Sequence, residues 1–312
     1  MAGPTDVPVR RPAVAGLFYP DDPAQCRATA RAFLDRANPL RERDASDPRG
    51  ATGSRRWIGG IVPHAGWICS GAIAAETIAT VARSAASAQR AVDVVVVFGA
   101  VHTPLPLERA VLDSFGAWQL PGDAAHVARE LRGRIHQASE LFGTDDRFHL
   151  REHAVEVELP LVREALPNVD VLPVEVPLVE EAVEIGKLTA RAVMDAKLRA
   201  VFLASSDLTH YGPAYHFAPA GVGLHGLDWA AGNDRRLLDL VARYDVARVV
   251  SEVGENQSAC GGGAIAAMMA ACREFGASEA RVLRHASSYQ TLAEVAPQPP
   301  DNAVGYAAVV VG

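Results

Sequence analysis

The chain has 312 residues, of which 49% are hydrophobic, 21% charged and 6% aromatic, a composition that excludes a disordered or fibrous protein. Its 30 Lys and Arg against 37 Asp and Glu give a net charge of −7, and the basic residues form no stripe, so nucleic acid is not an expected partner. No apolar run approaches the roughly 20 residues of a membrane span, the N-terminus lacks a signal-peptide pattern, and four cysteines are too few for a disulfide framework, so we expect a cytoplasmic protein.

The N-terminal segment is expected to form an extended arm over about residues 1–22, because its prolines disfavour regular structure. A helical pattern follows at 24–36. Residues 38–56 are charged, rich in Pro, Gly and Ser, and nearly free of large apolar side chains, which predicts a surface loop.

Short apolar runs without alternation then recur, as is typical of strands buried on both faces. The predicted strands are 58–62, 92–98, 169–174, 200–203, 280–285 and 304–311. The predicted helices are 71–83, 124–136, 152–165, 179–194, 228–243 and 263–275, with a loop at 291–302. The alternation predicts a single α/β domain over 1–312, with a central, mostly parallel or mixed sheet covered by helices.

Three histidines follow predicted strands directly: His64, His102 and His210. Open α/β sheets bind ligands at the carboxyl ends of their strands, so these side chains are expected to meet in one crevice. Neutral imidazole is a metal ligand or a base at neutral pH. One such histidine alone more often caps a loop, but three together indicate a site.

Acidic residues accompany these histidines. Asp207 lies three residues before His210 and is either a ligand, a group that orients a histidine, or a helix cap. Glu152 and His153 open the predicted helix 152–165, where the helix dipole alone explains the acidic residues. Glu158 is expected on the exposed face of that helix, without a functional role.

Cys260 precedes three glycines and an apolar helix. At a helix N-terminus the dipole favours a thiolate, which is a metal ligand or a nucleophile; the alternative is a small buried hydrophobic residue. The other three cysteines, Cys26, Cys69 and Cys272, are read as structural.

Six motifs in order, RRPAVAGLFYP, PHAGW, GAVHTP, EHAVEVELP, SSDLTHYG and CGGGAI, make the chain similar to the Memo-like family, also called the AmmeMemoRadiSam system protein B type. The resemblance runs from about Val9 to the C-terminal YAAVVV. It implies one α/β domain like that of the class III extradiol dioxygenases. The chain departs from the family at GAVHTP, where a serine-rich turn is expected, although His102 is retained.

The resemblance also assigns roles by position. His64, His102 and Cys260 match the residues that hold a metal, with iron(II) or copper proposed and zinc a further candidate. Cys260 stands where the dioxygenases use a glutamate, which favours softer metals and weakens the case for catechol cleavage. His210 matches an acid/base histidine and Asp207 an acidic residue near the metal; with His153, Asp207 is expected to orient ligands or substrate.

The leading hypothesis is therefore an iron- or copper-dependent redox protein acting on an unidentified small substrate. One alternative is a binding module that holds phosphorylated or carboxylate ligands in the same pocket, since animal members of the family are described as adaptors for phosphorylated receptor tails. Another is a hydrolase that uses Cys260 as nucleophile or zinc to activate water. The resemblance further implies AMMECR-like and radical-SAM proteins as partners.

Overall fold

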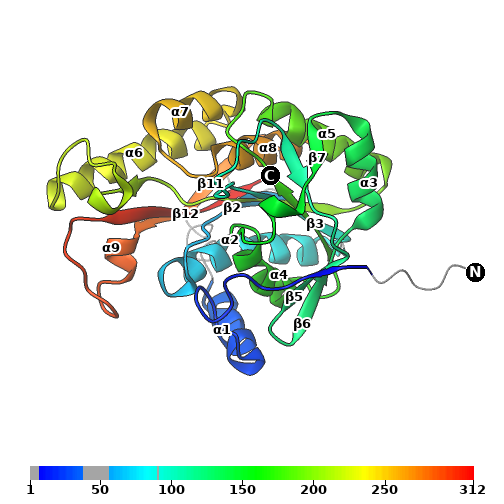
Figure 1. The fold of residues 1–312 in the computed structure, drawn as a ribbon, viewed down its shortest axis with the longest axis horizontal. Coiled ribbons are helices and arrows are strands. Elements are labelled where there is room, and N and C mark those ends of the chain that lie inside the picture. The colour runs from blue at the N-terminus through cyan, green and yellow to red at the C-terminus, as the bar shows by residue number, and fades with distance from the viewer. Residues whose placement is uncertain (1–6, 38–55, 90) are drawn as a thin grey trace, which may run out of the picture.

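In the computed structural model, residues 7–37, 56–89 and 91–312 are described (Figure 1). Within them, nine strands form a mixed central sheet in the order β10-β12-β2-β9-β3-β8-β4-β7, with β11 paired to β12. The strands are β2 (Gly59–Val62), β3 (Val94–Gly99), β4 (Ala110–Leu112), β7 (Phe142–Thr144), β8 (Asp170–Glu175), β9 (Ala200–Ser205), β10 (His210–Tyr211), β11 (Ala280–Ser287) and β12 (Ala303–Val311). The predicted single α/β fold with a mixed sheet is confirmed.

The centre of the sheet is parallel. Strands β2, β9, β3 and β8 run side by side in the same direction, and every residue of β3 is buried. The β-branched run Val94–Val97 therefore packs on both faces, as its lack of alternation predicted. β12 pairs with β2 and runs antiparallel to it.

Helices cover both faces of the sheet, as Figure 1 shows. On the upper face in that view lie α3 (Arg129–Ala138), α5 (Ala182–Asp195), α7 (Val249–Asn256) and α8 (Gly262–Glu274). On the lower face lie α1 (Pro23–Arg36), α2 (Trp67–Ser87) and α4 (Leu159–Ala165). Two further helices, α6 (Leu224–Ala242) and α9 (Ser288–Thr291), accompany the β10–β12 side.

Two predicted helices begin later than expected. The segment 124–136 opens as strand β6 (Asp123–His126), which pairs with β5 (Ala117–Leu120), and α3 begins only at Arg129. The segment 152–165 opens as a loop and a 3₁₀ turn, η2 (Glu156–Glu158), and α4 begins at Leu159. Pro160 explains this second start, because proline fits the first turn of a helix and not its interior.

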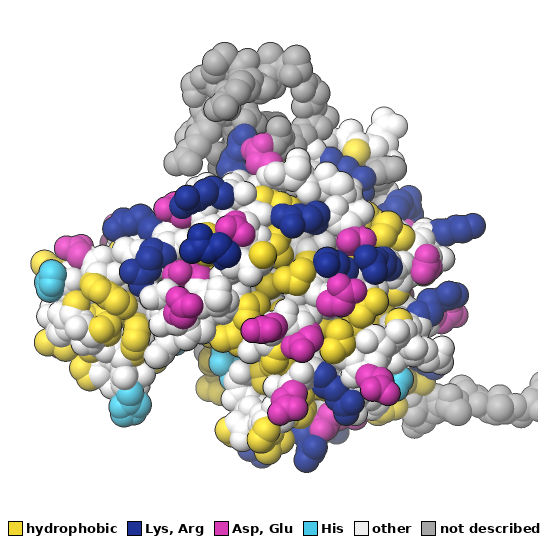
Figure 2. Space-filling model, turned by 90° about the horizontal axis from the view of Figure 1, so that it is seen from above, with side chains coloured by type: hydrophobic (Ala, Val, Ile, Leu, Met, Phe, Trp, Pro, Cys, Tyr) yellow, Lys and Arg dark blue, Asp and Glu magenta, His cyan; other side chains and the backbone are white. Residues whose placement is uncertain are grey.

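The N-terminal arm is extended but not without regular structure. Its strand β1 (Val9–Arg10) pairs parallel to β5, which gives a small second sheet in the order β1-β5-β6. Residues 1–6 of the arm and 38–55 of the predicted surface loop lie outside the described residues. None of the described helices is long and apolar enough to span a membrane. On the face seen in Figure 2, basic and acidic side chains are interspersed.

The arm is fixed by a fully buried ion pair. The Nη1 atom of Arg10 lies 2.6 Å from Oε2 of Glu156, and both side chains are fully shielded from solvent. Glu156 also accepts the backbone N–H groups of Ala13 and Val14 and the hydroxyl of Tyr19. Because Glu156 satisfies four donors at once, the arm is part of the fold.

We predict that Glu156→Ala lowers the free energy of unfolding by about 3–5 kcal/mol, because it leaves the Arg10 guanidinium buried without a counter-charge. The matched control is Glu164→Ala, which removes the partner of the exposed Arg31 and should cost about 1 kcal/mol or less. Urea denaturation measures both. Equal losses in the two variants would contradict the assignment.

Candidate metal centre

The register of the central strands brings the site together. Gly99 of β3 lies beside Glu175 of β8 on one side and Ser205 of β9 on the other, and Ser205 pairs with Val62 of β2. The four strands therefore end at the same level. His64 follows β2 by two residues, His102 follows β3 by three and Asp207 follows β9 by two, so these side chains start from the same edge of the sheet. The sequence grouped His64 and His102 with His210, whereas the histidine that clusters with them is His153.

Hydrogen bonds fix the ring of His64 and its tautomer. Nδ1 lies 2.9 Å from Oγ of Ser205, and that hydroxyl donates its proton to the carbonyl of Ala154 at 2.6 Å. Ser205 must therefore accept from His64, so Nδ1 carries the ring proton. The lone pair therefore lies on Nε2, which is 3.3 Å from Sγ of Cys260 and accepts a hydrogen bond from that thiol.

Glu152 fixes His102 in the same way. Its two carboxylate oxygens accept the backbone N–H of His102 at 2.6 Å and the Nδ1 proton of the ring at 2.8 Å. A carboxylate only accepts hydrogen bonds, so Nδ1 carries a proton and Nε2 is the nitrogen that a metal can bind once its own proton is lost. Glu152 also accepts the backbone N–H groups of His153 and Ala154. This role excludes the helix N-terminus that we expected at this residue.

A third imidazole completes the cluster. Nitrogen atoms of His64, His102 and His153 all lie within 4.8 Å of one another. The rings of His102 and His153 stack with centroids 4.5 Å apart, and the ring of His64 stands nearly perpendicular to both. Solvent reaches the cluster from the side of His102, whose side chain is 34% exposed, whereas His64 is buried.

Cys260 lies at the edge of this cluster. Its backbone N–H donates to the carbonyl of Asp207 at 3.2 Å, and Sγ also contacts that carbonyl. The next residue, Gly261, donates its N–H to Oγ of Ser206 and caps α8. The loop after β9 thus holds the thiol beside the histidines.

Electrostatics leave most of the cluster uncharged. Burial lowers the pKa of His64 well below its ordinary value, and burial with the neighbouring His102 lowers the pKa of His153 to about 4. His102 differs: burial opposes its charged form, but Cys260 and Glu152 together raise its pKa. Burial raises the pKa of the Cys260 thiol, so the helix N-terminus does not by itself produce the thiolate that we expected.

Asp207 and His210 lie on the loop after β9. Oδ1 of Asp207 accepts the backbone N–H of His64 at 2.8 Å, and burial raises the pKa of this carboxyl to about 7. Nδ1 of His210 lies 3.1 Å from the carbonyl of Leu208, to which it donates, so Nε2 holds the lone pair. The ring of His210 contacts Tyr215 edge to face at 5.0 Å.

Several residues of the site are not evident from the sequence. Ser205, which sets the tautomer of His64, lies within the strand-end motif SSDLTH, where any serine fits a loop. Phe18 of the arm packs edge to face on His153 with centroids 5.0 Å apart. Glu158 is fully buried and not on an exposed face, which corrects our expectation. The expectation assumed a helix from residue 152, whereas α4 begins at Leu159.

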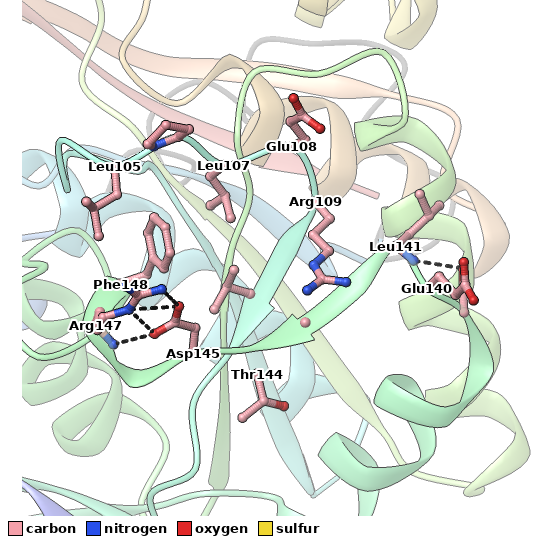
Figure 3. Close-up of a pocket in the computed structure, with 14 residues that line it drawn as sticks. Leu105, Leu107, Glu108, Arg109, Glu140, Leu141, Thr144, Asp145, Arg147 and Phe148 are labelled. Carbon is pink, nitrogen blue, oxygen red and sulfur yellow. Dashed lines mark hydrogen bonds and ion pairs between the residues drawn. The ribbon is translucent and has the colours of Figure 1, made fainter.

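A cavity of about 1000 Å³ lies elsewhere, between the loop after His102 and strand β7 (Figure 3). The guanidinium of Arg109 points into it, and Asp145 on its wall is paired with Arg147. None of the clustered histidines lines this cavity. Cavity volume alone therefore does not locate the candidate site. The candidate site is the histidine cluster at the strand ends.

The fold and the cluster define an α/β protein with three histidines at the carboxyl edge of its sheet, in an arrangement that could hold a metal ion. The family model described as "Memo-like protein" matches residues 10–310, and the chain belongs to this family. It is 31% identical to a MEMO1 family protein of Methanosarcina acetivorans over 97% of this chain and 99% of that protein. It is 30% identical to one of Pyrococcus furiosus with the same coverage.

We predict that Glu152→Gln lowers the pKa of His102 by at least about one unit, because the amide no longer stabilises the imidazolium. The midpoint of the ring titration, which lies well above neutral pH in the wild type, should move toward neutral pH. Ring ¹⁵N chemical shifts followed over pH measure this in metal-free protein. The control, Glu140→Gln, removes an exposed carboxylate remote from the cluster; an unchanged His102 titration in Glu152→Gln would contradict the prediction.

Proposed function

We propose that this protein binds iron(II) or copper through His64, His102 and Cys260, and uses the metal for an oxygen-dependent redox reaction on a small substrate. The observation that carries this proposal is the convergence of the donor atoms. Nε2 is the metal-facing nitrogen of both histidines because each Nδ1 proton is already bound, and Sγ of Cys260 lies 3.3 Å from Nε2 of His64.

The donor set suits these metals. Imidazole is a borderline ligand and thiolate a soft one, a combination that favours iron, copper or zinc over magnesium or calcium. Glu152 and Ser205 orient the rings, as partners of metal-binding histidines generally do. When bound, iron or copper would supply the one-electron steps and the open coordination position that oxygen chemistry requires.

The surrounding residues provide proton transfer and positioning. His210 is the general base and acid: its Nε2 is unprotonated, because Nδ1 donates to Leu208, and burial lowers its pKa. Asp207 positions His64 through the backbone N–H of that residue. His153 stacks on His102 and orients the ligands or the substrate.

Elemental analysis of protein purified without added metal tests the ligand assignment. We expect about one equivalent of iron or copper in the wild type and almost none in Cys260→Ala or His64→Ala, because each removes a donor. His153→Ala should keep its metal with an affinity roughly 10- to 100-fold lower, as for loss of a positioning group.

The control for this experiment is Cys26→Ala, a buried cysteine of α1, which should leave the metal content unchanged. Full metal in Cys260→Ala together with empty His153→Ala would replace the thiol by the third imidazole as ligand. Zinc in place of iron or copper would overturn the redox chemistry and favour hydrolysis.

We predict that metal affinity falls as the pH falls. His102 keeps its proton across the neutral range because Glu152 and Cys260 raise its pKa, and the raised pKa of Cys260 keeps the thiol protonated. Both protons must leave before the metal binds, so affinity should drop by about 10- to 100-fold per pH unit from pH 8 to 6. Competition with a chelator of known pH dependence measures this; a flat profile would contradict it.

A further inference from the structure

Asp234 is a buried acid that the proposed function does not use. It lies on α6, and only 2% of the residue is exposed. Its Oδ2 atom lies 2.8 Å from Nε2 of His285 on β11, and the ring donates because a carboxylate only accepts hydrogen bonds. Gly305 of β12 leaves room for this carboxylate, since a Cβ atom there would lie 2.1 Å from Oδ2. Three elements therefore fix the position of Asp234.

The other oxygen of Asp234 binds the loop after β9. Oδ1 accepts the backbone N–H of Thr209 at 2.9 Å. The remaining polar groups of Thr209, which is buried, are held as well. Nδ2 of Asn233, also on α6, donates to the Thr209 hydroxyl at 3.0 Å, and the N–H of Gly305 donates to the Thr209 carbonyl at 3.0 Å. Helix α6 and strand β12 therefore fix Thr209 from both sides.

The N–H group that Asp234 binds belongs to the peptide between Leu208 and Thr209. The carbonyl of the same peptide accepts the Nδ1 proton of His210, at 3.1 Å. A peptide group is planar and trans, so its N–H and C=O point in opposite directions. The bond from the N–H to Asp234 therefore directs the C=O to the side on which the ring of His210 lies.

We propose that Asp234 sets the tautomer of His210 through the Leu208–Thr209 peptide and is thus a positioning residue of the site. A carbonyl oxygen only accepts hydrogen bonds, so its contact with Nδ1 keeps the ring proton on that atom. Nε2 is then the nitrogen that takes up a proton. A carboxylate on the N–H also polarises the peptide, which makes its carbonyl a stronger acceptor. The role of His210 as a base rests on the proposed function, whereas its tautomer does not.

Asn233 allows positioning to be separated from stabilisation of the loop. It is as buried as Asp234, and its side chain donates to the hydroxyl of the same Thr209 and to the carbonyl of Asn256. Within the described residues, however, its side chain forms no hydrogen bond with the Leu208–Thr209 peptide. Loss of Asn233 should therefore loosen Thr209 without turning the carbonyl that faces His210.

Ring ¹⁵N chemical shifts of metal-free protein test the proposal. They are recorded above neutral pH, where the ring of His210 is uncharged because burial lowers its pKa. Long-range ¹H–¹⁵N spectra distinguish a protonated ring nitrogen from an unprotonated one, and His210→Gln identifies the signals among those of the ten histidines. In the wild type we expect the proton on Nδ1.

Asp234→Ala should lower the ratio of the Nδ1–H to the Nε2–H tautomer of His210 by roughly 2- to 10-fold, the effect of losing one neutral hydrogen bond. The N–H of Thr209 should also exchange faster with solvent. Asp234→Asn should keep the wild-type ratio, because the amide oxygen still accepts the N–H of Thr209. His285 accepts from the amide nitrogen in its other tautomer.

Two control variants keep the peptide contact. Asn233→Ala should lower stability and leave the tautomer ratio of His210 unchanged. Asp239→Ala removes an exposed carboxylate of the same helix and should change neither. Should Asp234→Ala fail to fold, Gly305→Ala replaces it, because the added Cβ atom displaces the carboxylate of Asp234. The same fall in the ratio is then expected.

The outcomes separate this proposal from the proposed function. An unchanged ratio in folded Asp234→Ala would overturn it, and so would a wild-type His210 with its proton on Nε2. Equal changes in Asp234→Ala and Asn233→Ala would also overturn it, because Asp234 would then only stabilise the loop. Elemental analysis of the wild type is independent of these spectra: absence of iron and copper would overturn the proposed function and leave the tautomer result standing.

Discussion

The structure depends on one constraint, the common level at which β2, β9, β3 and β8 end. Each strand is short and buried, so its last residue is fixed by pairing with both neighbours. Val62, Ser205, Gly99 and Glu175 lie in one row across the sheet as a result. A slip of one residue in any strand would point every following side chain to the opposite face. The buried strands therefore fix the positions from which the side chains of the cluster extend.

Glu152 affects the protonation of the site much as the strand register determines its geometry. It is a buried carboxylate kept ionised by four N–H donors, and its pKa falls to about 2 because the bonds and charge of His102 outweigh burial. A fixed negative charge in a dry region determines the protonation of its neighbours. It stabilises the imidazolium of His102 and disfavours a second negative charge on Glu175. One acid thus contributes to raised pKa values at two residues, which favours a charged imidazole at His102 and an uncharged carboxyl at Glu175.

The sequence predicted the scaffold well because that information is local. Uninterrupted β-branched runs such as 92–98 fit strands buried on both faces, and His64 and His102 follow two such strands. Segment 152–165 was misread because its charged and apolar residues also fit an amphipathic helix. What decides its structure is the contact of Glu152 with His102 and of Glu156 with Arg10, 50 and 146 residues away. Pairings at such separations leave no local pattern.

The burial of two acidic residues could not be predicted from local sequence patterns either. Glu158 and Glu175 lie among apolar residues in the sequence. A single glutamate in such a stretch normally predicts a solvent-exposed position. Their burial without a hydrogen bond to any part of the chain that the structure describes costs stability that apolar side chains of similar shape would not. Folded proteins tolerate such costs mainly where a function requires them. Gly99 supports this interpretation, because the strand gives up a side chain at that position to accommodate the carboxyl of Glu175.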